Sequence, residues 1–554
     1  MNKKRLKLFL ILIFVVFGIV IIRLIDIQIV HHSFYKQKAQ NQRRRIIPIA
    51  MERGDIYDRE GRLLATSVDV KSIYINPKEF RDYAKLENVL GKKIPRFSNK
   101  KLFAWVKRKV DFLTAKKIEE IGIPGVYFLD EKKRVYPKGR LAAQILGFVG
   151  LDNEGLSGIE LGMEDYLKGE EQNIVTESDP SGYELLTKRE SKKKKVSSGS
   201  DIYLTIDESI QFFAERELER TVAEYSALSG LIIVIDVENG EILALAGKPD
   251  FDPNYYAKSN PKNWHCKSVD IYEPGSTFKV ITAASGLDCG VITLDTKLRA
   301  LDQFEIGGRV IKNSHQINWG GNSTVSVSKM LEQSINTAVA QIGIKMGKER
   351  FYQKIRQFGF GDLIGLGLPG ESRGIVKEPS TWYAPDIAMM TFGQSIAVTP
   401  VQLCAAYMSI ANDGNLIRPQ LIKKIQNEDL SFIKKSRREE IGKSLSSKAA
   451  EDARLLLGNV VLKGSGRKAK IEGFTVGGKT GTAQKAAEGG RGYLKDRYIA
   501  SFIGFAPLSK PKILALVLVD EPKRVIWGET VCGPAFKNVV ENTLRYLNIK
   551  PDNG

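Results

Sequence analysis

The sequence predicts an α+β fold, in which helices flank an antiparallel sheet and an N-terminal transmembrane helix precedes it. Residues 231–236 and 241–246 are two apolar, strand-like runs joined across Asn239-Gly240, a dipeptide favoured in hairpin turns. Residues 499–505 and 513–519 form a second pair of this kind. Because helical segments lie between the two pairs, we expect one sheet with helices on both faces.

The N-terminus is typical of a membrane anchor. Basic residues within positions 1–7 precede an uncharged apolar run at 8–22. This run is short for a membrane span, but Arg23 and Asp26 can extend their side chains to the lipid interface. No Ala-x-Ala-like cleavage site follows closely, which favours an uncleaved anchor over a signal peptide. The basic end is then expected in the cytoplasm and the bulk of the chain outside it.

The composition excludes several classes of function. The chain of 554 residues has 84 Lys and Arg against 64 Asp and Glu, a net charge of +20 spread along the sequence. No nucleic-acid-binding motif accompanies this charge, so we expect attraction to anionic lipid or to another anionic polymer, and no nucleic-acid partner. The four cysteines and four histidines lack metal-ligand spacing. We therefore predict neither a metal site nor a histidine triad, and expect Cys404 to pack in the core.

Three short motifs occur in a fixed order: Ser276-Thr-Phe-Lys279, Ser334-Ile-Asn336 and Lys479-Thr-Gly-Thr482. Each motif alone is weak evidence of function, because such short sequences recur by chance. Together they supply a nucleophile, candidate bases and a carboxylate-binding strand. This is the equipment of a serine acyltransferase that uses no histidine.

The first motif provides the predicted nucleophile. Ser276 precedes an apolar helical stretch at 277–287, where free backbone amides and the helix dipole favour an alkoxide. Lys279 lies three residues later and so on the same helix face. Burial beside Lys479 would lower the pKa of Lys279 enough for its neutral amine to take the serine proton.

The second motif lies in residues 330–346, where apolar periodicity is broken at 333–337 as if polar groups faced a cleft. In the functional interpretation, Ser334 relays a proton to the leaving amine, and Asn336 holds the substrate amide and Lys279 in register. A helix-capping or internal hydrogen-bonding role is the alternative for both residues.

The third motif lies in a glycine-rich, edge-strand pattern at residues 475–483, which another backbone can approach closely. An extended peptide could add to this edge and place its terminal carboxylate at Lys479 and the neighbouring hydroxyls. The residues predicted to bind substrate are Thr480, Gly481 and Thr482. Backbone amides of Ser276 and Thr482 are the predicted oxyanion hole.

These residues resemble the active site of a penicillin-binding protein, specifically a class B peptidoglycan D,D-transpeptidase. The likeness extends from about Arg53 to Leu547. It implies a Ser276 acyl-enzyme formed from the D-Ala-D-Ala end of a stem peptide, transfer of the acyl group to an amine on a neighbouring strand, inhibition by β-lactams, and no cofactor. Further matching motifs are Arg53-Gly-Asp-Ile-Tyr-Asp-Arg59, Tyr136-Pro-Lys-Gly139, Gly155-Leu-Ser-Gly-Ile-Glu160, Val398-Thr-Pro-Val-Gln402 and Ser501-Phe-Ile-Gly-Phe-Ala-Pro507.

The resemblance also implies a domain organisation. A lysine-rich run at 192–195 and the following serines mark the boundary between an elongated, non-catalytic pedestal and the catalytic domain. Within the pedestal we expect a strand at 72–76 and helical patches over 102–121. The predicted divisions are a cytoplasmic tail (1–7), an anchor (8–30), a dimerisation-like pedestal (31–198), a transpeptidase domain (199–549) and a tail (550–554).

The likeness is greatest to FtsI-like septal enzymes of the bacterial cytoplasmic membrane, which implies division proteins and a SEDS-family glycosyltransferase as partners. An elongation-specific transpeptidase, a β-lactam-hydrolysing enzyme and a β-lactam-sensing receptor are the alternatives. Three positions depart from the family pattern, Gln144, Cys266 and Gly528-Glu529. We expect them to affect loops and partner contacts and to leave the three motifs untouched.

Overall fold

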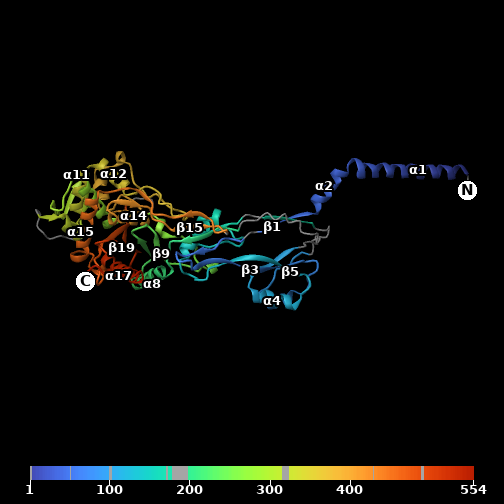
Figure 1. Cartoon of the computed structure of the whole chain (residues 1–554), viewed down its shortest axis with the longest axis horizontal. Helices are drawn as coiled ribbons and strands as arrows, with labels where there is room; N and C mark the ends of the chain where they lie inside the picture. Colours follow the sequence, from blue (N-terminus) through green and yellow to red (C-terminus); the bar gives the residue numbers. More distant parts are fainter. Residues whose placement is uncertain are drawn as a thin grey trace. The chain divides into compact units, whose positions relative to one another are not determined.

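The computed structural model describes residues 3–49, 52–98, 103–169, 172–177, 198–314, 323–427, 429–487 and 492–553 (Figure 1). The chain divides into two compact units, Met1–Glu52 with Gly169–Gly199, and Arg53–Lys168 with Ser200–Gly554. The lysine-rich run at 192–195 and Leu102, both used in the sequence-based predictions, lie outside the described residues.

The first unit contains the expected anchor helix. Helix α1 (Lys3–Ile25) continues through a π-helical segment, Asp26–Val30. Among the described residues, Lys3–Val30 is the one helix long and apolar enough to cross a membrane. Its 28 residues span about 40 Å, more than a hydrocarbon core. Helix α2 (His32–Arg43) follows, and β1 (Arg44–Ile49) pairs antiparallel with β6 (Gln172–Glu177).

The second unit begins with a long antiparallel strand pair, β3 (Leu63–Ile75) with β5 (Val126–Val135), beside β4 (Ala104–Val110). The strand predicted at 72–76 lies at the end of β3. The helical prediction over 102–121 is wrong in its first half, because the buried side chains of β4 follow a strand pattern; only α4 (Phe112–Ile121) is helical. The other helices of this region are α3 (Tyr83–Leu90), α5 (Ala143–Leu146), α6 (Gly158–Gly162) and α7 (Glu164–Leu167).

One sheet joins this region to residues beyond the predicted boundary at 198. Its strand order is β16-β15-β7-β2-β3-β4, with β5 also paired to β3. Strand β7 pairs parallel with β2 and antiparallel with β15. The bounds of the strands not yet given are β2 (Ile56–Tyr57), β7 (Asp201–Leu204), β15 (Ile422–Gln426) and β16 (Phe432–Lys435). The predicted boundary at 198 lies one residue before the junction of the two units at 199–200, but the predicted pedestal is divided between those units and its strands share this sheet with β7. The boundary stays a sequence-based prediction.

The predicted catalytic sheet has five strands in the order β18-β19-β20-β8-β9, all antiparallel. Both strand pairs expected from the sequence are present, and Gly240 takes the left-handed backbone (φ 79°) that its turn requires. The strands are β18 (Gly477–Ala486), β19 (Tyr493–Ala506), β20 (Ile513–Asp520), β8 (Ser229–Asp236) and β9 (Ile242–Lys248).

Helices cover both faces of this sheet, as predicted. Alternate residues of β8 show the arrangement, because Ile233 belongs to one apolar cluster and Ile232 to the other. One face packs against α8 (Glu208–Glu224) and α17 (Gly533–Tyr546). The other packs against α9 (Lys279–Asp288), α14 (Pro400–Ala411) and α15 (Ser447–Lys463).

Shorter elements complete this part of the chain. The helices are α10 (Val327–Glu332), α11 (Asn336–Met346), α12 (Lys348–Gln357), α13 (Ala384–Met390) and α16 (Gly528–Val531). Three two-stranded ladders pair β10 (Lys297–Arg299) with β13 (Thr324–Ser326), β11 (Gln303–Ile306) with β12 (Arg309–Lys312), and β14 (Asn415–Ile417) with β17 (Glu440–Lys443).

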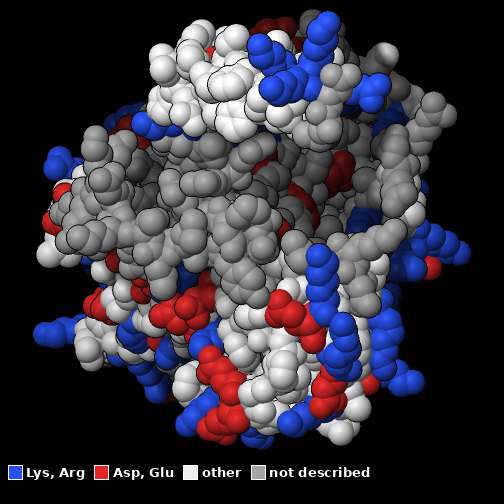
Figure 2. All heavy atoms as spheres, turned by 90° about the vertical axis from the view of Figure 1, so that its right-hand side faces the viewer, with Lys and Arg blue, Asp and Glu red and all other residues white. Residues whose placement is uncertain are grey.

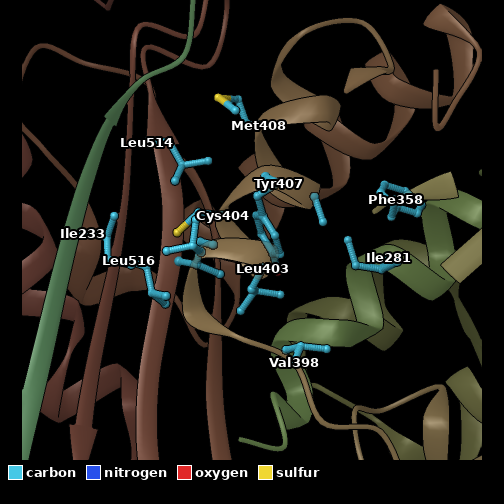
Figure 3. Packing of buried hydrophobic residues seen from close by; sticks show 14 of the residues in the cluster. Ile233, Ile281, Phe358, Val398, Leu403, Cys404, Tyr407, Met408, Leu514 and Leu516 are labelled. Carbon is cyan, nitrogen blue, oxygen red and sulfur yellow. The ribbon is translucent and has the colours of Figure 1, made fainter. Parts of the chain in front are cut away.

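Helix α14 is buried along its whole length between the sheet and α9. Figure 3 shows Leu403, Cys404 and Tyr407 of this helix between Leu514 and Leu516 of β20 and Ile281 of α9. Cys404 is fully buried, as expected for a core residue. A Thr399 and Gln402 capping box fixes the start of the helix.

Charged side chains are mixed on the surface. Over the lower half of the face shown in Figure 2, basic and acidic side chains are interspersed. This agrees with the even spread of charge along the sequence.

Candidate active site

The three motifs meet at one pocket. Its lining includes Ser276, Ser334, Asn336, Thr480 and Thr482. Lys279 and Lys479 are fully buried, at 0% exposure each. The remaining lining residues are Gly275, Ser314, Gln333, Phe392, Gln394, Ser465, Ala483, Trp527, Gly528 and Glu529.

Ser276 lies on a tight turn, a 3₁₀ helix at Gly275–Phe278 that leads directly into α9. Gly275 has φ 57°, and a Cβ there would lie 2.9 Å from the Cβ of Ala483, so the position requires glycine. The hydroxyl of Tyr407 in α14 donates to the carbonyl of Thr277 at 2.7 Å. The core helix thus fixes the turn that carries the predicted nucleophile.

Both buried lysines donate hydrogen bonds to Ser334. Lys279 Nζ lies 3.0 Å from Ser334 Oγ and also donates to the Ser334 carbonyl, and Lys479 Nζ lies 3.1 Å from the same Oγ. Ser334 connects α10 to α11 in a left-handed conformation, with φ 57°. Its backbone and side chain both face Lys279 as a result. Within the described residues no hydrogen bond joins Ser276 Oγ to Lys279, the contact expected from their spacing.

Burial sets the charge state of the two lysines. Burial, together with repulsion from Lys479, holds the pKa of Lys279 well below its usual value. Burial lowers the pKa of Lys479 to about 7. Lys479 also donates to the carbonyl of Thr480 at 3.1 Å. The low pKa predicted from the sequence for Lys279 therefore agrees with its surroundings.

Asn336 begins α11 and lines the pocket. It does not make the predicted contact with Lys279 and instead binds a backbone carbonyl. Its Nδ2 donates to the carbonyl of Lys312 at the end of β12, at 2.7 Å. In this structure Asn336 holds a strand against the rim of the pocket.

Strand β18 is an edge strand, as the glycine pattern predicted, and among the described strands it pairs with β19 alone. A Cβ on Gly481 would lie 2.3 Å from Ser501 Oγ and 3.1 Å from Thr277 Cγ2, so glycine permits the close approach of strand and nucleophile turn. Thr480 Oγ1 is 2.9 Å from Ser465 Oγ, and Thr482 Oγ1 accepts a hydrogen bond from Gly528 N at 3.2 Å.

The expectation that Gly528-Glu529 leaves the motifs untouched is wrong, because Gly528 binds Thr482 and both residues line the pocket. Ser465 and Trp527 are two further lining residues that no sequence pattern predicted. Ser465 follows α15, Trp527 precedes α16, and Gly528 and Glu529 begin α16, so all four lie outside the motifs in the sequence. A spacing signal within each motif cannot detect them.

The α+β sheet domain with its Ser-x-x-Lys, Ser-x-Asn and Lys-Thr-Gly pocket defines a protein of the penicillin-interacting class. Residues 230–541 match the family described as Penicillin binding protein transpeptidase domain. Residues 48–204 match the Penicillin-binding Protein dimerisation domain. The chain belongs to the class B penicillin-binding proteins.

Individual proteins show the same relationship. Stage V sporulation protein D of Bacillus subtilis is 33% identical, over 99% of this chain and 86% of its own length. Peptidoglycan D,D-transpeptidase FtsI of Escherichia coli K12 is 28% identical, over 95% and 89%. The crystal structure of penicillin-binding protein 3 from Mycobacterium tuberculosis, complexed with ampicillin, gives a TM-score of 0.74 at 25% identity, over 92% of this chain and 98% of that chain.

Proposed function

We propose that the chain is a monofunctional peptidoglycan D,D-transpeptidase that cross-links stem peptides through a Ser276 acyl-enzyme, in septal wall synthesis. The observation that carries the proposal is the shared hydrogen bonding of Ser334 Oγ by Lys279 and Lys479, both fully buried beside the pocket that Ser276 lines.

In the proposed acylation, the stem peptide binds along the free edge of β18. Its terminal carboxylate meets Lys479 and the hydroxyls of Thr480 and Thr482. The neutral amine of Lys279 takes the proton of Ser276, and Ser276 Oγ attacks the carbonyl carbon of the penultimate D-Ala. Backbone amides of Ser276 and Thr482 stabilise the oxyanion, and Gly481 permits the close approach.

Ser334 is suited to donate a proton to the leaving amine. Because its Oγ accepts hydrogen bonds from two lysines, its own hydroxyl hydrogen is free to point at the leaving amine. The C–N bond breaks as this proton reaches the nitrogen of the last D-Ala. Lys279 then reprotonates Ser334. The acceptor amine repeats the sequence in reverse and displaces Ser276.

Labelling with a fluorescent penicillin, followed by peptide mapping, tests the proposal. We expect one adduct, on Ser276, and none in Ser276→Ala, because a β-lactam mimics D-Ala-D-Ala. Thermal unfolding of the variant should match that of the wild type. An adduct on Ser334, or one that persists in Ser276→Ala, would disprove the role of the nucleophile.

The alternatives differ in what happens to the adduct. A β-lactamase would release hydrolysed drug within seconds to minutes, and a receptor would form the adduct without turning over a stem peptide. We expect a long-lived adduct together with transfer of a peptide acyl group to an added amine. An elongation role is tested separately in cells.

We further propose the membrane arrangement and the partners. The N-terminus lies in the cytoplasm, α1 spans the membrane once, and the pedestal and catalytic domains (31–198 and 199–549) lie outside. The pedestal recruits division proteins and a SEDS-family glycosyltransferase, which supplies the glycan strands. The family resemblance supports these partners, and the exposed apolar helix at the N-terminus supports the single span.

A further inference from the structure

The rim of the pocket carries the carboxylate of Glu529, which has no partner among the described residues. Glu529 lines the pocket and is only partly buried, yet no hydrogen bond or ion pair joins its side chain to the part of the chain that the structure describes. Lys468 donates to the hydroxyl of the neighbouring Thr530 at 3.1 Å and makes no bond to Glu529 within the described residues. A negative charge at the mouth of a substrate cleft attracts a cationic group.

An exposed aromatic ring accompanies it. Trp527 lines the same pocket and is 48% exposed, which is unusual for tryptophan in a folded protein. The face of an indole ring attracts an ammonium ion, and its area packs against methylene groups. Trp527 and Glu529 thus offer the two features that bind an alkylammonium side chain.

Trp527 and Glu529 lie at the start of α16, beside β18, and this position determines which residue of a bound peptide they contact. Helix α16 packs directly on β18, because a Cβ on Gly528 would lie 2.4 Å from the Gly481 carbonyl. Gly528 N also donates to Thr482 Oγ1. With the peptide carboxylate at Lys479 and Thr480 and the reacting carbonyl at Ser276, the preceding residue extends past Thr482. That residue runs alongside α16.

We propose that Trp527 and Glu529 form a subsite for a primary ammonium group on the donor peptide, carried by the residue that precedes its D-Ala-D-Ala end. The inference rests on the proposed function and adds a substrate preference to it. A diamino acid with a free side-chain amine supplies such a group. Glu529 is a specificity residue in this arrangement and takes no part in the bond-making steps.

The test compares two thioester donors, Nα-acetyl-L-Lys-D-Ala-thioglycolate with its side-chain amine free or acetylated. Each transfers its acyl group to Ser276 and releases a thiol that is measured directly. The full-length protein in detergent should prefer the free amine by about two- to fivefold in kcat/KM, the scale of one partly exposed ion pair. Glu529→Gln should reduce the preference to about one, and Glu529→Asp should restore part of it.

Matched controls separate this site from general charge effects. Glu472→Gln removes one exposed carboxylate outside the pocket and should keep the wild-type preference. Trp527→Leu should lower the preference and raise the KM of both donors, because methylene packing is lost too. Equal ratios in wild type and Glu529→Gln would overturn the inference. So would a Glu529→Gln effect confined to the acceptor amine.

Labelling by fluorescent penicillin distinguishes a failure of the ammonium subsite alone from a failure of the proposed function. If every variant is labelled at Ser276 but the donor ratio does not change with Glu529, only the ammonium subsite is wrong. If the wild type is neither labelled nor releases thiol from either donor, the proposed function fails, and the subsite fails with it.

Discussion

Lys279 and Lys479 bind the same hydroxyl but have different surroundings. Lys279 donates to the carbonyl and to Oγ of Ser334, and repulsion from Lys479 adds to the effect of its burial. Lys479 lies on the edge strand and also donates to the carbonyl of Thr480. Two adjacent buried ammonium ions repel each other strongly, so one must be neutral. Both burial and repulsion lower the pKa of Lys279, whereas burial alone lowers that of Lys479, so Lys279 is the neutral one.

The two lysines should therefore respond differently to replacement by arginine. Lys279→Arg keeps the charge but cannot supply a neutral amine, so acylation should fall about a hundredfold or more. Lys479→Arg keeps the charge that the substrate carboxylate needs and should be milder. Stopped-flow acylation rates with penicillin measure both effects, and the reverse ranking would show that Lys279 is not the base.

The pH dependence of the acylation rate should reflect the protonation states of Lys279 and Lys479. The rate should rise with pH as Lys279 loses its proton, because only the neutral amine is a base. It should fall above about pH 7 as Lys479 loses its charge, since burial lowers the pKa of Lys479 to about 7. In Lys479→Arg the fall should disappear, because arginine stays charged. An alkaline fall that persists in this variant would contradict the role of Lys479.

At the scale of elements, a buried ion-pair cluster ties α6 to the strands of the pedestal region. Glu160 of α6 is fully buried and accepts hydrogen bonds from Arg53 Nε and Arg134 Nε, both at 2.6 Å. Arg53 also donates to the Glu160 carbonyl, and the hydroxyl of Tyr136 lies 3.3 Å from its carboxylate. A motif from each of three distant segments thus converges on one carboxylate.

Removing that charge should destabilise the fold markedly. Glu160→Gln removes the buried carboxylate that Arg53 and Arg134 share, which leaves Arg53 with Glu164 and Arg134 with Asp55 at 3.9 Å. We expect a loss of about 3–5 kcal/mol in the free energy of unfolding. The matched control is Glu164→Gln, because Glu164 also pairs with Arg53 but is 25% exposed; its loss should be about 1 kcal/mol or less. Urea unfolding of both variants tests this. Equal losses would mean that Glu160 has no special role.

The elements also show what the sequence can and cannot predict. The strand pairs, the edge position of β18 and the convergence of Ser276, Ser334 and Lys479 follow from local patterns. The left-handed turn at Ser334, the Lys312 partner of Asn336 and the approach of Gly528 to Thr482 depend on tertiary packing between distant segments. No pattern within one segment specifies such contacts.

At the scale of the whole molecule, the anchor is separable from the catalytic machinery. The apolar side chains of α1 are exposed, whereas the pocket is built from residues of the second unit. Strand β1 begins at Arg44 and pairs with β6, so a chain that starts near Gln40 keeps this ladder intact. Location and acylation therefore depend on different parts of the chain.

A protein starting near Gln40 should accordingly be soluble and still bind penicillin at Ser276. It should polymerise no lipid II by itself, because glycan synthesis is assigned to a partner. Gel filtration without detergent, penicillin labelling and a lipid II polymerisation assay check the three outcomes. The matched comparison is the full-length protein in detergent. Glycan synthesis by the purified fragment would refute a monofunctional enzyme.

The cellular role depends on surfaces that recruit partners. Two segments resemble septal enzymes in sequence, residues 152–160 and residues 520–523, and they differ in how they could contact a partner. Glu160 and Glu521 are buried in ion pairs, so they stabilise the fold. The loop before α6 instead exposes Leu151 and Leu156, at 50% and 46%. Exposed apolar side chains on a loop are suited to contacting another protein.

We predict that these contacts place the enzyme in the division machinery. In a rod-shaped host, depletion should yield filaments, because side-wall synthesis continues while septal cross-linking stops. A fluorescent fusion should collect at midcell, and Leu151→Ser with Leu156→Ser should disperse it while penicillin labelling of Ser276 persists. The matched control is Leu430→Ser, an apolar position on the loop before β16 that is 73% exposed. Rounded cells with a dispersed wild-type fusion would place the protein in the elongation machinery, because loss of side-wall cross-linking abolishes the rod shape.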